Sequence, residues 1–442
     1  MTVIAHLADV HLSFAQFNLL EREEDIYELF SDAMRMCLEE RVKAVLIAGD
    51  LFDKYRPSNR ALSVFRKAVQ PLISRGIKII AVQGDHDAVK RRDLSVLHVM
   101  AEYLEGFKLL PAYRAGDEKT CYTIRDGNIY IKVYGAPFIP RILGRVEYYN
   151  KLFRIIERHA KKDAEHRNVK NILLGHFPIV EFFPEKYDPG VSLSTLPRNI
   201  DYFALGHLHN RIIDRTPWGS VVAYSGSLDI LRKDEIRDWQ RNGKGFYLVD
   251  LSGDEPSIEK VNLDVRPQFV IEGPPQTVIT SLGKILNRES LKKPILHITL
   301  HTKEKHRDLI ERRVANMLEG RVLTYRLTTI TESEKEIVQV KKSCSEIEII
   351  ASKLGGDKNL ALAVMKLKDC IADCSPKECN SEVEEVLSFK NKWKQLLADQ
   401  LSYEATTITN RMVFEKTAPS TTFTKKRRAN KPLTLRDFLE GP

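Results

Sequence analysis

Five short apolar segments of the chain each end in aspartate or histidine, and this pattern restricts the possible fold more than any other feature. The segments are residues 3–8, 44–48, 77–82, 172–174 and 202–205. Each resembles a buried strand, and between them apolar residues recur with helical spacing, at about 22–40, 60–74, 93–104 and 143–163. Strands that alternate with helices predict an α/β fold whose sheet is covered by helices.

The polar residues that follow these segments belong to the types that bind metal ions. They are Asp9, His11, Asp50, Asp53, Asp85, His86, Asp87, His176, His207 and His209. Glycine stands beside the first polar residue in four of the five segments, which permits a sharp turn and a close approach of the backbone. Because strand ends on one side of an α/β sheet converge, we expect these side chains to share one pocket.

Carboxylates and imidazoles in one pocket suit Mn, Fe or Zn, and the absence of cysteine argues against a structural zinc site. The candidates exceed the needs of one ion, so we expect two ions with Asp50, on a central strand, as the bridging ligand. Such pairs stabilise the attacking and departing oxygens of phosphoryl transfer and supply a hydroxide at neutral pH. A single Asp or His at a strand end is usually a turn former or a satisfied polar group, whereas five such ends together favour metal binding.

The overall composition indicates a soluble protein with an anionic partner. With 442 residues, the chain is expected to form two or three domains. The net charge of +9 and the pI near 9.0 favour a polyanion such as nucleic acid. We expect no membrane span, because no run of about 18 apolar residues occurs. The N-terminal residues lack the order of a signal peptide, and the six cysteines do not form a disulfide framework, so we expect an intracellular location.

The pattern along the chain predicts four parts. They are an α/β domain at 1–265 that closes in a meander of strands near 211–214, 220–225, 246–251 and 258–263, a small α/β cap at 266–335, helices at 336–415, and a basic flexible tail at 416–442. In the cap, strands are predicted within 292–300 and 321–330, with a helix at 306–318 between them.

The motifs D-x-H, GDxxD, GDHD, GH and GHxH occur in the same order as in the calcineurin-like metallophosphoesterases, which the chain resembles. Within them, "HLADVHL", "AGDLFDKYRPS" and "YSGS" resemble the nuclease subunit of the double-strand-break repair complex, the meiotic-recombination-eleven or SbcD family, in its compact archaeal form. The resemblance covers residues 1–265 well and the cap moderately. It implies a four-layer αββα sandwich with a small, DNA-binding α/β cap at 266–335 and a C-terminal helical extension.

The resemblance also implies a DNA exonuclease and endonuclease with two Mn²⁺ ions, or alternatively Mg²⁺. One ion would be bound by Asp9, His11, Asp50 and His209, and the other by Asp50, Asp85, His176 and His207. His86 would contact the scissile phosphate and help the leaving oxygen depart, Asp87 would orient His86 through a hydrogen bond, and Asp53 would support catalysis. DNA contacts are expected at Arg56, Ser58, Lys90, Arg91 and Arg92.

One residue departs from the family pattern, which has asparagine where this chain has Asp85. The additional carboxylate lowers the positive charge that remains when two divalent ions are bound. We therefore expect tighter metal retention and a weaker attraction for the phosphate.

The implied partners are double- and single-stranded DNA, a second copy of the chain, and an ABC ATPase of the structural-maintenance (SMC) type in a cytoplasmic, nucleoid-associated complex. The ATPase would dock on helices within 336–415, where an apolar stripe comprises Val383, Val386, Leu387, Trp393, Leu396 and Leu397. The homodimer would use helices near 12–30, 60–74 and 93–104. Two alternatives remain open: a metal-dependent phosphatase or phosphodiesterase of the same superfamily, and a DNA-bound scaffold with reduced activity because of Asp85. Turnover of nitrophenyl phosphate without DNA cleavage would favour the first, and metal binding without turnover the second.

Overall fold

The computed structural model forms two compact units, Met1–Glu334 and Lys335–Pro442. It describes residues 1–332 except 90–93, 115–116, 118–119, 141–143, 167, 184–189 and 289, and then 347, 350–351, 354, 357–373 and 380–389. The domain boundaries expected after 265, 335 and 415 stay predictions, and the tail at 416–442 lies outside the described residues.

Two six-stranded sheets form the body of the first unit. One contains β1 (Val3–Leu7), β2 (Ala44–Ala48), β3 (Lys78–Val82), β4 (Phe107–Leu109), β11 (Gly245–Asp250) and β12 (Ser257–Asn262) in the order β12-β11-β1-β2-β3-β4. The other contains β5 (Cys121–Asp126), β6 (Ile129–Ala136), β7 (Val169–His176), β8 (Tyr202–Gly206), β9 (Ile212–Arg215) and β10 (Val221–Tyr224) in the order β5-β6-β7-β8-β10-β9. Because β1, β2 and β3 are parallel, and so are β7 and β8, each set of carboxyl ends lies at one edge of its sheet.

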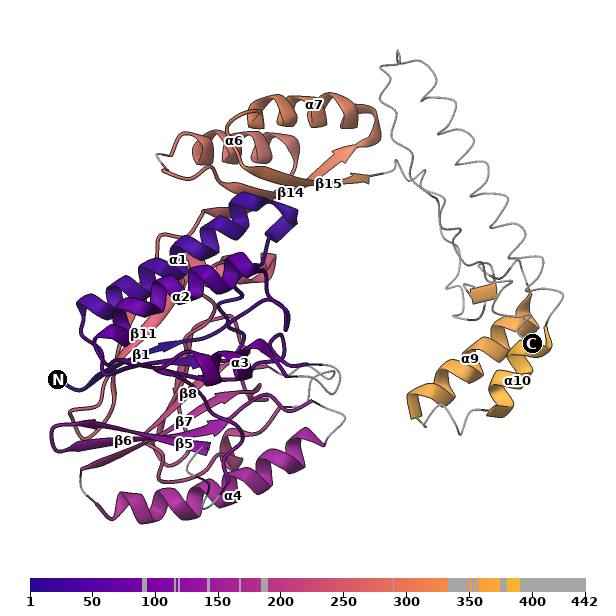
Figure 1. Cartoon of the computed structure of the whole chain (residues 1–442). Coiled ribbons are helices and arrows are strands. Elements are labelled where there is room, and N and C mark those ends of the chain that lie inside the picture. The colour runs from indigo at the N-terminus through magenta and orange to yellow at the C-terminus, as the bar shows by residue number, and fades with distance from the viewer. Residues whose placement is uncertain are drawn as a thin grey trace, which may run out of the picture. The chain divides into compact units, whose positions relative to one another are not determined.

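Helices cover the outer face of each sheet (Figure 1). Helices α1 (Leu20–Glu39) and α2 (Asn59–Ser74) share a core with Ala5 and Leu7 of β1. Ile4, one residue before Ala5, faces the other way because side chains alternate along a strand, and it packs with Tyr202 between the sheets. Helix α4 (Arg145–Ala164) covers the second sheet through Phe203. The three cores confirm the predicted αββα sandwich.

The predicted meander at 211–263 is wrong. Strands β9 and β10 join the second sheet, whereas β11 pairs with β1 of the first sheet, and β12 pairs with β11. The connection 225–244 therefore crosses from one sheet to the other. Short strands joined by turns do not reveal which sheet edge each strand will join, so the local pattern could not predict this crossing.

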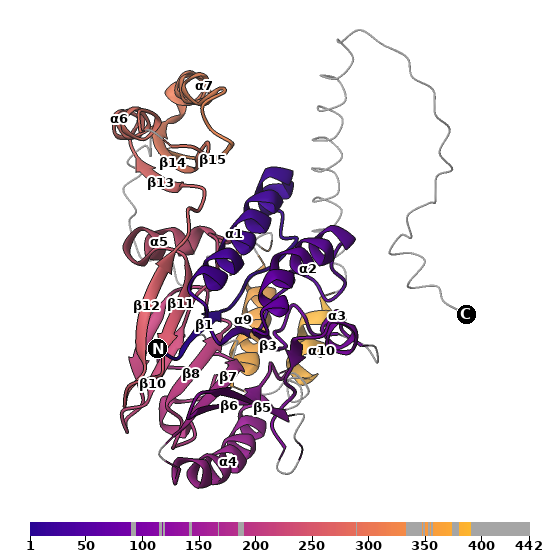
Figure 2. The same cartoon turned by 60° about the vertical axis from the view of Figure 1, so that its left-hand side comes forward.

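The cap has its own three-stranded parallel sheet in the order β13-β14-β15, seen near the end of α1 in Figures 1 and 2. Its strands are β13 (Gln268–Gly273), β14 (Ile295–Lys303) and β15 (Thr324–Glu332), and its helices are α6 (Pro275–Leu286) and α7 (Arg307–Leu318). Val278, Leu296 and Val314 are buried in a common core. Strands β14 and β15 and helix α7 match the sequence prediction, and β13 and α6 are additions to it.

A buried ion network fastens the cap to α1. The Asp25 carboxylate accepts hydrogen bonds from Arg266 at 2.6 and 2.9 Å, from Arg22 at 2.6 Å and from Lys292 at 3.0 Å. Arg22 also donates to Asp229 at 2.6 Å, and both Arg22 and Asp25 are buried. Burial alone would raise the pKa of Asp25, but Arg266, Lys292 and Arg22 hold it below its usual value.

In the second unit the structure describes α9 (Lys358–Asp373) and α10 (Asn380–Ser388). Leu360 and Val386 are buried, whereas Leu387 is 57% exposed. Trp393, Leu396 and Leu397 of the predicted apolar stripe lie outside the described residues. Throughout the described part of the chain, every helix is too short or too polar to cross a membrane.

Candidate metal centre

The polar residues selected from the sequence meet where the carboxyl ends of the two sheets face each other. Four of them adopt a positive φ that residues other than glycine rarely take, with φ of 49° at Asp9, 50° at His11, 50° at Asp50 and 92° at His207. Such backbone strain clusters at functional sites, where surrounding contacts hold it in place. The strand ends thus turn abruptly and direct their side chains into one space.

Two glycines are required by the close approach of these turns. A Cβ atom on Gly84 would lie 2.1 Å from Asp50 Oδ1, and one on Gly206 would lie 1.9 Å from the Ala48 carbonyl oxygen. Either separation is far shorter than van der Waals distance. The structure therefore confirms that glycine permits a close backbone approach at these strand ends.

The candidate ligands form two groups with Asp50 between them. In each group the possible ligand atoms lie within 4.8 Å of one another, and the groups are Asp9, His11 and His209, and Asp85, His176 and His207. Asp50 Oδ2 lies 3.5 Å from His11 Nε2 and 3.6 Å from His176 Nε2. One carboxylate oxygen is thus placed to serve both groups.

Hydrogen bonds fix which ring nitrogen two of the histidines direct to the site. His176 Nδ1 lies 2.7 Å from the Ala48 carbonyl oxygen, which can only accept, so Nδ1 carries the proton. His209 Nδ1 lies 2.7 Å from Glu235 Oε1. In both rings the lone pair of Nε2 is left for a cation, which is the usual arrangement of metal-binding histidines.

Sequence analysis missed Glu235, although it holds His209. Glu235 is buried, and its other carboxylate oxygen accepts hydrogen bonds from Lys244 at 2.6 Å and Ser227 at 3.1 Å. Burial opposes its ionisation, but Lys244 and His209 lower its pKa to about 2. It lies in the charged segment 232–238, which has the composition of exposed surface, so no local signal indicates its burial.

The residues of this site fit bound cations. His11 Nε2 is buried and lacks a hydrogen-bond partner within the described structure, which is costly unless another group satisfies it. Burial lowers the pKa of His11, yet Asp53, Asp50 and Asp9 together raise it to about 9. The surroundings thus favour positive charge at this point, and the mixture of carboxylates and imidazoles suits a divalent transition metal.

The predicted hydrogen bond between Asp87 and His86 is wrong. The buried Asp87 carboxylate instead accepts from the backbone N–H groups of Leu51, Phe52 and Gly84 at 3.2, 3.1 and 3.1 Å. Burial and the charge of Asp50 raise the pKa of Asp87 to about 6. The turn at residues 84–87 directs this side chain back beneath the strand ends, so it ties the loop after β3 to the loop after β2.

His86 instead donates a hydrogen bond to Asp53. His86 Nδ1 lies 2.8 Å from the Asp53 carbonyl oxygen and 3.8 Å from Asp53 Oδ1, and the His86 side chain is 38% exposed. Asp53 Oδ1 also lies 3.6 Å from His11 Nδ1. Asp53 therefore stands between a candidate ligand and the more exposed imidazole.

Of the residues predicted to contact DNA, the structure describes Arg56 and Ser58. Arg56 is exposed, and its guanidinium lies 5.5 Å from the centre of the Tyr55 ring. Ser58 caps α2, because its Oγ accepts the N–H of Ala61 at 3.1 Å. Lys90, Arg91 and Arg92 lie outside the described residues.

A cavity of about 280 Å³ opens over the site. It is lined by Asp50, Asp85, His86, His207 and His209, together with Phe182, Phe183, Asn210, Arg232 and Glu235. Four of the candidate ligands and the partly exposed imidazole of His86 therefore face a common space that a phosphate group can enter.

Comparison with known proteins agrees with this geometry. Residues 2–211 match the calcineurin-like phosphoesterase family. The chain is 32% identical to a DNA double-strand break repair protein Mre11 of Saccharolobus solfataricus, over 70% of this chain and 78% of that protein. A protein of the same description from Sulfurisphaera tokodaii is 33% identical over 68% of this chain and 74% of its own length. The protein of this description from Methanococcus maripaludis is 30% identical over 77% of this chain and 87% of its own length.

Proposed function

The chain belongs to the Mre11 family of metal-dependent DNA repair nucleases, and from this premise we propose that it is a manganese-dependent exonuclease and endonuclease acting on double- and single-stranded DNA. The observation that carries the proposal is the position of Asp50 Oδ2, at 3.5 and 3.6 Å from ring nitrogens of the two ligand groups. Two cations bridged by one carboxylate are the arrangement used for phosphodiester hydrolysis.

Each ion would be held by four side chains. The first set is Asp9, His11, Asp50 and His209, and the second is Asp50, Asp85, His176 and His207. Bound divalent ions would offset the charge of the scissile phosphate and supply a nucleophile at neutral pH. Four imidazoles favour Mn²⁺ over Mg²⁺, which prefers oxygen ligands.

His86 is the group of this chain best placed to protonate the leaving oxygen. Its Nδ1–H donates to the Asp53 carbonyl oxygen, which fixes the ring and leaves Nε2 on the far side. The side chain is 38% exposed and lines the cavity, whereas the imidazole of His176 is fully buried. We assign the proton transfer to Nε2 of His86 and the placement of its ring to Asp53.

Two further parts of the proposal concern partners. Helices within 336–415, of which α9 and α10 are described, would dock an ABC ATPase of the SMC type, supported by the exposed apolar Leu387. A second copy of the chain would pack against α3 (Val96–Tyr103), where Val99 is 43% and Tyr103 is 83% exposed.

The test is incubation of the purified chain with end-labelled linear duplex and single-stranded DNA in Mn²⁺, Mg²⁺ or EDTA. We expect cleavage in Mn²⁺, less in Mg²⁺ and none in EDTA. A parallel reaction with 4-nitrophenyl phosphate separates the alternative, because a phosphatase would hydrolyse this monoester and leave DNA intact. That pattern would overturn the proposal.

A further inference from the structure

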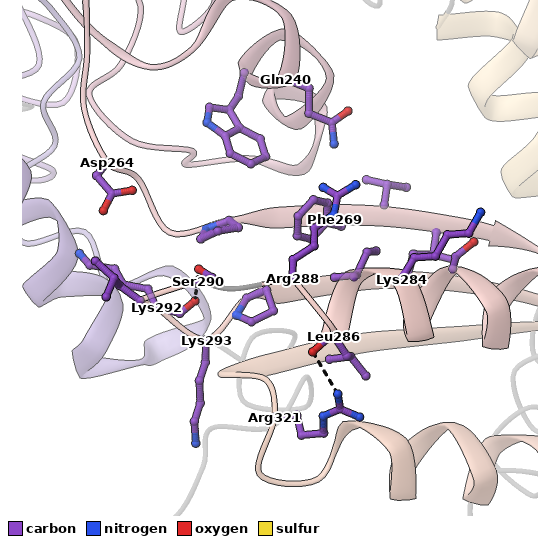
Figure 3. Close-up of a pocket in the computed structure, with 18 of the residues that line it drawn as sticks. Gln240, Asp264, Phe269, Lys284, Leu286, Arg288, Ser290, Lys292, Lys293 and Arg321 are labelled. Atoms are coloured by element: carbon purple, nitrogen blue, oxygen red, sulfur yellow. Dashed lines mark hydrogen bonds between the residues drawn. The ribbon is translucent and has the colours of Figure 1, made fainter.

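The cavities away from the metal centre differ in the part of the fold that forms them. The largest of those described, of about 1310 Å³, lies at the cap and is lined by Phe269, Lys284 and Arg288 among others (Figure 3). It belongs to the part of the chain for which DNA binding is already expected. Another cavity, of about 690 Å³, lies where α1 and α2 end, and the proposed nuclease activity does not use it.

This second cavity lies at the edge of the sheets opposite to the metal centre. It is lined by Lys43, directly before β2, by Lys78, the first residue of β3, and by residues 122–126 of β5. The candidate metal ligands instead follow the carboxyl ends of β2 and β3. A strand rises about 3.3 Å per residue, so β2 holds the two sites on the order of 20 Å apart. The cavity is therefore separate from the metal centre.

Three cations in this cavity have no carboxylate to neutralise them. Arg41, Arg75 and Lys78 line it, and among the described residues no carboxylate pairs with any of the three. Asp126 also lines the cavity, but its carboxylate already pairs with Lys43 at 2.9 Å. The cavity thus has an excess of positive charge, which favours an anionic ligand.

The backbone at Arg41 is strained. Both α1 and α2 end in a Schellman turn, in which the two residues after the helix cap donate their N–H groups to carbonyls of the last helical turn. The first of these residues needs a positive φ, for which glycine is the usual choice. Helix α2 has Gly76 there, with φ of 81°, whereas α1 has Arg41, with φ of 53°. A bulky side chain held in this conformation is a sign of function.

The helix dipole explains only part of the charge. Arg41 and Arg75 each lie at the negative end of a helix, where a basic residue is stabilising. Lys78 belongs to a strand and gains no such stabilisation, yet it lines the same cavity. Arg125 lines it as well, but its guanidinium lies 5.7 Å from the centre of the Tyr130 ring, so we leave it out of the site.

An apolar surface lies beside these charges. Val42, Ile77 and Ile124 line the cavity and are buried, and Tyr122 lines it with a ring that is only partly buried. An aromatic ring offers a face on which a nucleobase stacks, and guanidinium and ammonium groups bind phosphates. The cavity volume falls in the range of sites for small ligands. Together these features fit a nucleotide better than a bare anion.

We propose that this cavity binds a nucleotide through its diphosphate group, with the phosphates at Arg41, Arg75 and Lys78 and the base against Tyr122. Three cations offset the charge of a diphosphate, whereas a single phosphate would leave positive charge unmatched. The site is independent of the proposed nuclease activity, because it shares no residue with the metal centre.

The experiment is isothermal titration of the full chain with thymidine diphosphate in EDTA, where the metal centre holds no cation that could bind phosphate. We expect saturable binding by the wild type. Lys78→Met and Arg41→Gly should each weaken it about 10- to 100-fold, the effect of losing one charge-assisted hydrogen bond. The matched control is Lys108→Met, at an exposed position of the neighbouring strand β4 outside the cavity, and it should bind like the wild type.

Arg41→Gly also separates binding from folding. Because glycine adopts a positive φ without steric strain, this variant should melt at the same temperature as the wild type or higher. Weaker binding by a variant of equal stability cannot arise from unfolding. Three results would each overturn the proposal: no saturable binding by the wild type, wild-type binding by both cavity variants, or equal weakening in Lys108→Met.

Two further ligands test whether the site is specific for a nucleotide. Pyrophosphate should bind the wild type more weakly than thymidine diphosphate, and Tyr122→Leu should remove this difference, because only the base contacts the ring. Equal binding of both ligands by the wild type would overturn the proposal in favour of a site for inorganic anions. Competition by an oligodeoxythymidylate as strong as by thymidine diphosphate, at equal phosphate concentration, would overturn it in favour of non-specific attraction of polyanions.

Discussion

At the scale of single residues, the metal centre depends on which nitrogen each imidazole presents. The Ala48 carbonyl oxygen sets this for His176 and Glu235 sets it for His209, at 2.7 Å in both cases. Glu235 in turn is kept ionised by Lys244, at 2.6 Å. The affinity of the centre for metal therefore depends on residues that contact no ion.

The variant Glu235→Gln tests this dependence. The amide keeps the size of the side chain but removes the charge that holds His209 and pairs with Lys244. We expect Mn²⁺ affinity to fall about 10- to 100-fold by isothermal titration, with DNA cleavage recovering at high Mn²⁺. Glu259→Gln, an exposed acid on β12, is the control and should match the wild type. Unchanged affinity in Glu235→Gln would contradict the role assigned to Glu235.

His86→Ala should separate proton transfer from metal binding. We expect DNA cleavage to fall about 10²- to 10⁴-fold, the usual contribution of a general acid, with two Mn²⁺ still bound per chain. Metal content is measured by plasma mass spectrometry after gel filtration. Loss of an ion from the variant would instead make His86 a ligand.

Asp85→Asn tests the departure from the family pattern. Asp85 Oδ1 lies 3.0 Å from His176 Nε2 and 3.3 Å from His207 Nδ1, so its charge acts directly on one ligand group. The neutral amide should weaken Mn²⁺ binding in titration and should keep or raise cleavage at saturating Mn²⁺. An inactive, fully loaded variant would refute the hypothesis.

The sequence predicts these site residues to different extents. The candidate ligands stand just after strands in the sequence, where they form recognisable motifs, and the structure brings them together. The partner of Asp87 could not be predicted, because proximity in sequence to His86 says nothing of the direction of the side chain after a turn. No sequence motif indicates Glu235, because 26 residues separate it from His209 and only the fold brings the two side chains together.

At the scale of elements, the network around Asp25 holds α1 and the cap together. Removing the charge of Asp25 takes the carboxylate partner from buried Arg266 and one of two carboxylate partners from buried Arg22, which keeps Asp229. Asp25→Asn should therefore destabilise the protein by about 3–5 kcal/mol, measured by urea unfolding at pH 7. Asp32, which pairs with Arg35 on the exposed face of α1, offers the control: Asp32→Asn should leave the unfolding free energy nearly unchanged.

The pH dependence of this network follows from the direction in which folding shifts the pKa of Asp25. The folded-state pKa of Asp25 lies below its unfolded value of about 3.9, so the ionised carboxylate stabilises the fold above that pH. This contribution is lost as the pH falls through the folded-state pKa. The difference in unfolding free energy between wild type and Asp25→Asn should hence be full at pH 7 and should shrink below about pH 4. A difference that stays constant to pH 3 would show that charge is not its cause.

The elements that the sequence predicts are those with a strong local pattern. Strands β1, β2, β3 and β8 are almost entirely apolar because helices bury one of their faces and the opposite sheet buries the other. Strand β4 has only three residues, and β12 is largely exposed and polar. The sheet to which each of β9 to β12 belongs depends on pairing with strands that are distant in sequence. The local pattern does not contain this information, so it predicted a single meander.

At the scale of the whole molecule, the two compact units should carry separable functions. A chain ending at residue 334 keeps all candidate ligands. It should hydrolyse bis(4-nitrophenyl) phosphate in Mn²⁺ like the full chain and should fail to co-purify with the ATPase encoded by the same organism. Retained co-purification would place the ATPase contact in the first unit.

The central claim is a pair of cations bridged by Asp50, and the most direct measurement is anomalous diffraction at the manganese edge from crystals soaked in Mn²⁺. The account predicts two peaks, one beside Asp9, His11 and His209 and the other beside Asp85, His176 and His207, with Asp50 Oδ2 between them. In Asp50→Ala crystals at least one peak should disappear. A single peak in the wild type, or two peaks that persist without Asp50, would contradict the account.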